Sequence, residues 1–279
     1  MNLRRSYVYW LALYIFCIFW TSCTSSKLNK TKEVIYPTFT KILTKYQVTG
    51  TIVIYDQSRD IYYSNDFEWA NTGFLPASTF KIPNSIISLE LGVMASDSTI
   101  IPWDGQKRYL PLWEQDLMLR DAFKVSCVPC YQEIAKKIGV ERMQKFLKKL
   151  KYPGMVFDAS TIHNFWLEGN SRITPMEQID FLKQLYHRKI PISDITAVRL
   201  KSMMKMENIN NDILYGKTGY STSIRDNGLF VGYNEVAGNV YYFATNIVPN
   251  VGTSNADFIA ARLRVTKDAL LELKSLHEK

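Results

Sequence analysis

The sequence predicts one α+β domain of α-β-α type, in which helices flank a central antiparallel sheet and a helical lobe is inserted beside it. Three observations support this fold class. Runs rich in β-branched and aromatic residues occur near both ends of the chain, residues 105 to 205 are mostly helical in pattern, and 47% of the 279 residues are hydrophobic. Such a chain can bury a sizeable core, and we expect strands from both ends to share one sheet.

The first part of the folded region predicts a hairpin followed by a helix. The run "VTGTIVIYDQSRDIYYSN" predicts two strands around a polar turn at Gln57 to Asp60. The apolar spacing from Ile82 to Met94 predicts a helix whose start lies near Ser78. Pro83 falls near the end of its first turn, so we expect the helix to start a residue late or to bend there.

Helical patterns and then strand patterns follow along the chain. "YQEIAKKIGVERMQKFLKKL" and "TPMEQIDFLKQLYHRK" have the helical period, and Thr174 with Glu177 predicts a capping box. From Ile213 three β-rich runs occur, and a helix from about Ser254 to Leu276 closes the chain. We therefore expect a single domain over residues 36–279, with the helical lobe at about 105–205.

Residues 1–22 have the pattern of an export signal, with a basic start and an apolar run of about fifteen residues. "FWTSC" resembles the box before the lipidated cysteine of bacterial lipoproteins, which predicts lipidation of Cys23, although Trp20 departs from the usual aliphatic residue. Residues 23–35 are then expected to form a tether. The alternative is an uncleaved membrane anchor. Both interpretations place an exported, periplasmic fold outside the cytoplasm.

The formal net charge of +8 is spread along the chain, without a dense basic block or a nucleic-acid motif. We interpret the charge as an aid to solubility and as an attraction for small acidic substrates. A nucleic-acid partner is therefore not expected.

Cys127 and Cys130, in "SCVPCYQE", have several interpretations. An exported C-x-x-C is a disulfide, a redox pair or half of a zinc site. We favour two buried free cysteines that pack as small apolar side chains on one helix. No second cysteine pair exists outside the signal, and His163, His187 and His277 are scattered. No metal site is therefore expected.

Ser78 and Lys81 form an S-x-x-K pair at a predicted helix start. Residues three apart on a helix face the same side, and a helix start stabilises negative charge on a substrate. The spacing alone is weak evidence, because about one chance match is expected in such a chain. The stretch "SMMK", Ser202 to Lys205, repeats it without a cap signal, and we interpret it as ordinary packing. Ser78 is the better candidate nucleophile.

Two further stretches strengthen the candidate. "SCV" places Ser126 at the start of another predicted helix, and "KTG", Lys217 to Gly219, lies at the end of a predicted strand. A given tripeptide such as KTG occurs by chance in about three chains per hundred of this length. The ordered set of S-x-x-K, S-x-V and K-T-G is therefore stronger evidence than any one member.

S-x-x-K and K-T-G are shared by penicillin-binding proteins and serine β-lactamases. With "STFK", "SCV" and "FWLEG" (Phe165 to Gly169), the chain resembles the class D, oxacillinase-type, serine β-lactamases from about Val48 to Leu270. The resemblance implies a transpeptidase-like fold. The Tyr-Gly-Asn that the family usually carries upstream of W-L-E-G is replaced by "YPGM", Tyr152 to Met155. Because that element lies at the rim of the family's site, the departure concerns the substrate range.

A serine hydroxyl needs a base within hydrogen-bond reach, and a protonated lysine cannot be that base. Desolvation by apolar neighbours is expected to lower the pKa of Lys81; these neighbours are Phe80, Val128, Trp166 and Leu167. The resemblance implies that the neutral amine adds carbon dioxide and becomes an N-carboxylated lysine, with no other cofactor. The indole N–H of Trp166 would hold this group.

The resemblance also implies the remaining roles. Ser78 attacks the lactam carbonyl, with the backbone N–H groups of Ser78 and Tyr220 as the oxyanion hole. Ser126 passes a proton to the ring nitrogen, and Lys217 supplies positive potential beside it. The substrate carboxylate meets Lys217, Thr218 and an arginine, for which "R-x-x-V-T-K" favours Arg262 over Arg264. The expected substrate-binding residues are Val128, Leu167, Thr218, Gly219, Tyr220 and Arg262. For Glu168 we favour a structural role, such as a salt bridge.

The expected function is hydrolysis of the β-lactam ring of penicillin-type antibiotics through an acyl-serine intermediate, which would give resistance. One alternative is a β-lactam sensor that stays acylated. Such receptors carry several membrane spans and a metalloprotease, and the sequence shows neither. Another is a D,D-peptidase of the cell wall, against which S-x-V with W-L-E-G argues.

Overall fold

The computed structural model describes residues 31–206, 212–223 and 226–277 of the 279-residue chain. The expected export signal, Cys23 and the tether up to residue 30 lie outside the described residues. Residues 31–279 form one compact unit. In the described part of the chain, no helix combines the length and apolar character needed to cross a bilayer.

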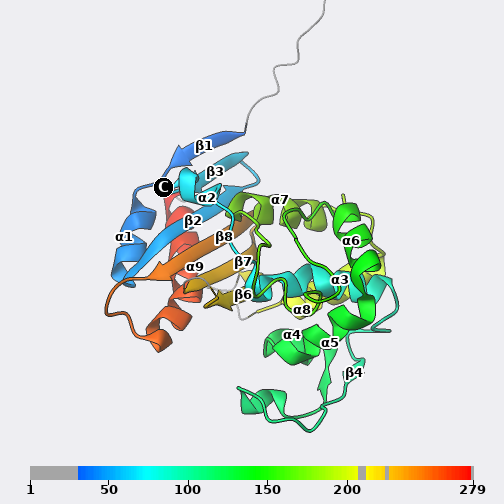
Figure 1. Ribbon diagram of the computed structural model, residues 1–279. Helices are drawn as coiled ribbons and strands as arrows, with labels where there is room; N and C mark the ends of the chain where they lie inside the picture. Colours follow the sequence, from blue (N-terminus) through cyan, green and yellow to red (C-terminus); the bar gives the residue numbers. More distant parts are fainter. Residues whose placement is uncertain (1–30, 207–211, 224–225, 278–279) are drawn as a thin grey trace, which may run out of the picture. The chain divides into compact units, whose positions relative to one another are not determined.

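A six-stranded sheet forms the centre of this unit, with the strand order β1-β3-β2-β8-β7-β6 (Figure 1). Its strands are β1 (Lys32–Ile35), β2 (Val48–Asp56), β3 (Ile61–Ser64), β6 (Ile213–Ser221), β7 (Asn227–Val236) and β8 (Asn239–Pro249). Every pairing is antiparallel except that of β1 with β3, which is parallel. The predicted fold class is confirmed, with the correction that the sheet is mixed.

The strand β1 also corrects the expected tether, because its residues belong to the sheet. Lys32 pairs with Ile61 and Ile35 with Ser64. The segment has a polar appearance because β1 is an edge strand with three of its four residues exposed. Edge strands commonly carry lysine, which discourages pairing with other chains.

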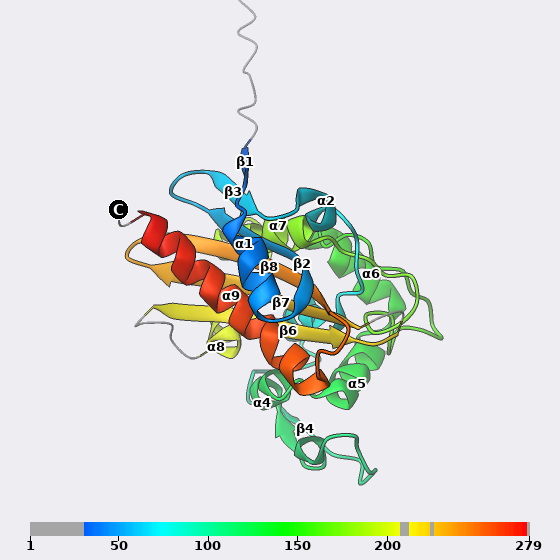
Figure 2. The ribbon, with the colours of Figure 1, turned by 90° about the vertical axis from the view of Figure 1, so that its left-hand side faces the viewer.

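Helices cover both faces of the sheet. On one face, α1 (Thr38–Lys45) and α9 (Asn255–His277) pack on β2, β7 and β8 (Figure 2). On the other face lies α7 (Pro175–Tyr186). The predicted capping box starts α7: Glu177 N–H donates to Thr174 Oγ1 (3.0 Å), and Thr174 N–H donates to Glu177 Oε2 (2.8 Å).

The helical lobe continues the α7 side of the sheet. It contains α3 (Lys81–Glu90), α4 (Leu119–Lys124), α5 (Val128–Ile138), α6 (Val140–Lys149) and α8 (Asp194–Met204). A two-stranded sheet, β4 (Ile100–Ile101) with β5 (Leu117–Met118), accompanies them. The short elements α2 (Phe67–Ala70), η1 (Ala77–Phe80) and η2 (Pro111–Trp113) complete the order. The helix expected from Ile82 to Met94 ends earlier, at Glu90.

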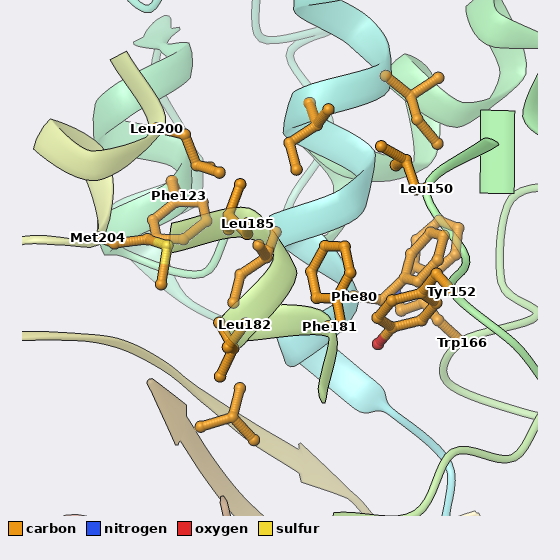
Figure 3. Close-up of a cluster of buried hydrophobic side chains, with 14 of the residues drawn as sticks. Phe80, Phe123, Leu150, Tyr152, Trp166, Phe181, Leu182, Leu185, Leu200 and Met204 are labelled. Carbon is orange, nitrogen blue, oxygen red and sulfur yellow. The ribbon is translucent and has the colours of Figure 1, made fainter. Parts of the chain in front are cut away.

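Two hydrophobic clusters follow from this layering. One lies between the sheet and the pair α1 and α9, and the other joins the opposite face of the sheet to the lobe. Figure 3 shows the second cluster, in which Phe80 and Trp166 lie near Tyr152 and Phe181. Phe80 belongs to η1, so the core of the lobe directly supports the turn that carries Ser78.

Candidate active site

The turn that carries Ser78 is anchored from both sides. Ser78 lies on η1 and is 7% exposed. Ala77, just before it, has a φ of 48°, a left-handed conformation that is costly for a residue with a Cβ atom. The Ala77 N–H donates to Trp166 O at 2.8 Å, and Thr79 Oγ1 donates to Pro76 O at 2.6 Å. The W-L-E-G segment therefore holds the turn in its strained shape.

Lys81 is the first residue of α3 and is only 1% exposed. Its Nζ donates to Ser78 Oγ at 3.0 Å. Burial, and secondly the charge of Lys217, hold the pKa of Lys81 well below its usual value. The structure thus brings the predicted nucleophile and base together, and it favours an uncharged amine.

An aromatic ring lies beside this amine, and a stacked aromatic pair includes Phe80, its neighbour in the chain. Lys81 Nζ lies 5.0 Å from the centroid of the Tyr131 ring, and Trp166 stacks on Phe80 with centroids 5.5 Å apart. Trp166 is fully buried, and its Nε1 has no hydrogen-bond partner within residues 31–206, 212–223 and 226–277. A buried donor without an acceptor is unusual, so this indole is free to donate to an additional acceptor group.

The K-T-G stretch lies in the middle of β6, a correction to the prediction that it ends a strand. The strand β6 is at the edge of the sheet and packs against η1. A Cβ atom on Gly219 would lie 3.2 Å from Pro76 O and from Thr79 Cγ2. Glycine therefore permits the close approach of β6 to the Ser78 turn.

Lys217 is buried between this strand and the lobe. It is 5% exposed, and its Nζ donates to Thr218 O at 3.0 Å and lies 5.8 Å from the centroid of the Phe123 ring. Burial, followed by the charge of Arg262, lowers the pKa of Lys217 to about 7.

Arg262, and not Arg264, reaches the site. Arg262 Nη1 donates to Gly219 O at 2.7 Å, whereas Arg264 is exposed on α9. A Cβ atom on Gly228 would lie 2.8 Å from Arg262 Cγ, so glycine leaves room for the arginine stem. Burial lowers the pKa of Arg262 to about 10, which leaves the guanidinium charged at neutral pH.

The other predicted substrate-binding residues lie around the same edge. Thr218 and Tyr220 are half-buried on β6, and the Tyr220 hydroxyl donates to Asp226 Oδ1 (3.1 Å) and Asn255 Oδ1 (3.2 Å). Val128, the first residue of α5, and Leu167 are half-buried.

The W-L-E-G segment is tied to the edge strand. Ser221 Oγ donates to Leu167 O at 3.2 Å, and a cavity of about 240 Å³ lies between Leu167 and the end of β6. Glu168 is exposed and accepts a hydrogen bond from Asn164 Nδ2 at 3.3 Å. It forms no salt bridge within the described residues, which corrects the ion pair suggested for it.

A larger cavity of about 760 Å³ adjoins Lys217 and Thr218. Lys124, Lys205 and Lys267 line it together with apolar side chains. Lys205 and Ser202 belong to the second S-x-x-K stretch, at the end of α8, and both line this cavity. The interpretation of that stretch as ordinary packing stays a prediction.

Ser126 precedes α5 and, like Ala77, has a left-handed conformation, with a φ of 56°. Its hydroxyl makes no hydrogen bond within the described part of the chain, whereas its N–H donates to Phe123 O at 3.2 Å. The structure thus places Ser126 in the turn after α4, whose Phe123 also faces Lys217.

Cys127 and Cys130 form a disulfide, with Cα atoms 5.4 Å apart. This corrects the expectation of two free cysteines. The first turn of α5 brings residues i and i+3 to one side, which allows either packing or a bond. Within the described residues, no group of three or more potential metal ligands occurs.

Sequence reasoning missed several residues of the site. Tyr131 borders Lys81, Phe123 borders Lys217, and Gly228 accommodates Arg262; Asn84, whose buried Oδ1 has no partner among the described residues, donates to Tyr131 O. Asn84 follows Lys81 by three residues, and Tyr131 follows Val128 by three, so helical spacing is the signal that could have found both.

Comparisons with known proteins agree with this geometry. Residues 46–268 match the penicillin binding protein transpeptidase domain. The chain is 40% identical to β-lactamase OXA-48 of Klebsiella pneumoniae over 232 residues, which cover 83% of this chain and 86% of the relative. The chain belongs to the class D β-lactamases. It is therefore a serine β-lactamase, a hydrolase that opens the β-lactam ring.

Solved structures support the same assignment. A class D β-lactamase from Nostoc is 41% identical, with a TM-score of 0.80 over 85% of this chain and 98% of that chain. One from Sebaldella termitidis is 35% identical, with a TM-score of 0.82 over 88% of this chain and 99% of that chain. The transpeptidase-like fold of this class D β-lactamase is thus confirmed.

Proposed function

We propose that this class D β-lactamase works through an acyl-Ser78 intermediate, with an N-carboxylated Lys81 as the general base. The observation that carries the proposal is the buried Lys81 amine, 3.0 Å from Ser78 Oγ and with a lowered pKa. Only a neutral amine can react with carbon dioxide, and burial at this position keeps the amine neutral.

The surroundings of Lys81 fit a carbamate. When present, the carbamate supplies an anionic base at a position that otherwise holds a neutral amine. Trp166 Nε1, which has no partner among the described residues, would donate to it. The burial of Lys81 and the nearby Tyr131 ring exclude water from the group, and exclusion of water slows proton-driven loss of the carbon dioxide.

In the proposed acylation, the Lys81 side chain removes the proton from Ser78 Oγ, which attacks the lactam carbonyl. The N–H groups of Ser78 and Tyr220 stabilise the oxyanion, a contribution of about 3 kcal/mol for each donor. The C–N bond of the ring then breaks. Ser126 delivers its proton to the nitrogen and regains one from the Lys81 side chain, which restores the base for the next step. Lys217, buried beside Phe123, orients this proton transfer by its positive potential.

Substrate binding is assigned to the edge strand and α9. The carboxylate of the β-lactam is held by Thr218, Lys217 and Arg262, and a planar guanidinium suits two-point contact with a carboxylate. Binding of this anion favours protonated Lys217, whose pKa of about 7 lies within reach of such a shift. Val128, Leu167, Gly219 and Tyr220 form the walls of the site.

Hydrolysis of the acyl-enzyme uses the same base. Lys81 removes a proton from water, which attacks the ester carbonyl, and the proton returns to Ser78 Oγ as the product leaves. We further propose that residues 1–22 direct export, that Cys23 carries a lipid anchor, and that the activity confers resistance to β-lactam antibiotics. The pattern of basic, apolar and small residues before Cys23 supports the proposed location.

Carbon NMR with ¹³C-labelled bicarbonate tests the base directly. The wild-type enzyme is expected to show one carbamate resonance that disappears when the pH is lowered enough to protonate the amine. A Lys81→Ala variant serves as the control and should lack the resonance. A wild-type enzyme that hydrolyses β-lactams without any carbamate signal would reject the proposed base.

A further inference from the structure

The Cys127–Cys130 disulfide has no part in the chemistry proposed above, yet Cys127 directly follows Ser126. We propose that this disulfide is a redox-sensitive positioning element for Ser126, and that its reduction by a small dithiol or a dithiol protein slows acylation of the enzyme. The inference rests on the proposed role of Ser126 as proton donor to the ring nitrogen.

The backbone around Ser126 is held from the cysteine side. Ser126 keeps its left-handed conformation between two turn hydrogen bonds, Ser126 N–H to Phe123 O (3.2 Å) and Cys127 N–H to Ala122 O (2.9 Å). A strained residue of this kind persists only where its neighbours hold it. The disulfide ties Cys127 to the first turn of α5, so it restrains the residue next to Ser126.

Stability alone is a weak explanation for this bond. A disulfide stabilises a fold mainly by closing a loop in the unfolded chain, and the effect is smallest for short loops. Cys127 and Cys130 are only three residues apart, and both already lie in a turn of helix. The bond therefore restrains the local geometry more than the fold.

The disulfide is largely buried, but it borders a cavity large enough for a small reagent. Both cysteines line a cavity of about 310 Å³ that they share with Trp103 and Trp113. Cys130 is 8% exposed, whereas Cys127 is fully buried. A thiolate that enters this cavity would therefore attack the sulfur of Cys130.

Cys127 is a favourable leaving group for that attack. It is the N-cap of α5, and its Sγ accepts a hydrogen bond from Cys130 N–H at 3.2 Å. A helix N-terminus stabilises a thiolate and lowers the pKa of its thiol. Exchange is faster when the departing thiol has a low pKa.

The exchange is balanced in two steps. A thiolate of the dithiol forms a bond with Cys130 Sγ, the Cys127–Cys130 bond breaks, and Cys127 leaves as a thiolate. The second thiolate of the reductant then attacks its own sulfur in the mixed disulfide, and Cys130 leaves. Two electrons pass to the protein, the reductant becomes a disulfide, and its two protons pass to the cysteines.

The test compares oxidised full-length enzyme with enzyme treated with dithiothreitol, and free thiols are counted by alkylation and mass spectrometry. Single-turnover measurements then give the rates of acylation and deacylation with one β-lactam. We expect reduction to slow acylation about fivefold or more, to change deacylation less than about twofold, and to be reversed by reoxidation. A general loosening of the structure would slow both steps.

A Cys127→Ser/Cys130→Ser double variant is the matched control, because it retains Cys17 and Cys23. It should acylate at the rate of the reduced enzyme and should not respond to dithiothreitol. If the treated enzyme has two additional free thiols but acylates at the rate of the oxidised enzyme, the inference is overturned. A disulfide that resists reduction in the folded enzyme would also overturn it. If the variant does not fold, the reversible titration of the wild type decides. Absence of β-lactam turnover in every redox state would instead reject the proposed function.

Discussion

Lys81 Nζ lies 3.0 Å from Ser78 Oγ, and both side chains are buried against the edge strand of the sheet. A Lys81→Ala variant should therefore lose about a thousandfold or more in kcat/KM, because removal of a general base leaves the hydroxyl unactivated. Steady-state hydrolysis of a chromogenic cephalosporin measures this loss. Lys136→Ala is the control, since Lys136 is exposed on α5, pairs only with Glu133 in the described residues, and should retain normal turnover. Normal turnover in the Lys81→Ala variant would remove Lys81 from the mechanism.

Trp166 Nε1 is a buried donor without a partner in the described residues. A Trp166→Phe variant keeps a ring on Phe80 but removes this donor, so its activity should depend more steeply on added bicarbonate. Titration of activity with bicarbonate is the measurement. Trp69→Phe is the control, because Trp69 Nε1 donates to Asn246 Oδ1 at 2.8 Å. That variant should lose about 1 kcal/mol of stability and keep the wild-type bicarbonate dependence. If the bicarbonate titration of the Trp166→Phe variant matches that of the wild type, the indole N–H does not hold the carbamate.

Arg262 and Arg264 share one helix but differ in position relative to the site. Arg262→Ala should lower kcat/KM for carboxylate-bearing β-lactams about tenfold to a hundredfold, because a charged hydrogen bond to the substrate is lost. Arg264→Ala, at an exposed position, should change it less than about twofold. Kinetics with a β-lactam and with its methyl ester, which lacks the carboxylate charge, show whether Arg262 acts on the carboxylate. If the ester and the acid respond equally to Arg262→Ala, the arginine does not bind the carboxylate.

Lys217 should make stability rise with pH above neutrality. The unfolded lysine stays protonated up to about pH 10.5, whereas burial lowers the folded pKa to about 7. Between these values the unfolded chain binds one more proton, so the free energy of unfolding increases by about 1.4 kcal/mol for each pH unit. Urea unfolding at pH 7 to 9 in carbonate-free buffer measures this slope.

The control for that slope is Lys217→Met, which removes the titrating group but retains Lys81. The free energy of unfolding of this variant should increase less with pH than that of the wild type. Identical slopes would show that Lys217 is charged in the folded enzyme throughout this range.

Much of the site could be predicted because its chemistry is carried by short motifs. Ser78, Lys81 and Lys217 are ordered along the chain in the pattern shared by serine β-lactamases, and the structure places them together. The fold class followed from β-rich segments at both ends. These signals are local, so they can be recognised in the sequence without knowledge of the tertiary structure.

Other features depended on contacts that no local pattern specifies. The strand β1 was hidden by its charge, because an edge strand needs apolar residues on only one side. The state of Cys127 and Cys130 is decided by side-chain geometry within one helical turn. Gly228 matters only because the sheet register places it opposite Tyr220 and beneath Arg262.

The pairing of β2 with β8 has a consequence for how the chain is made. Val48 lies opposite Pro249 in the register, so two central strands come from opposite ends of the chain. Contacts between distant segments form slowly, because a long loop must close first. During synthesis the sheet therefore lacks its middle until nearly the whole polypeptide has emerged. This delay allows chaperones to bind the nascent chain and keeps it in a form that can be translocated unfolded. It also leaves apolar strands exposed, which favours aggregation.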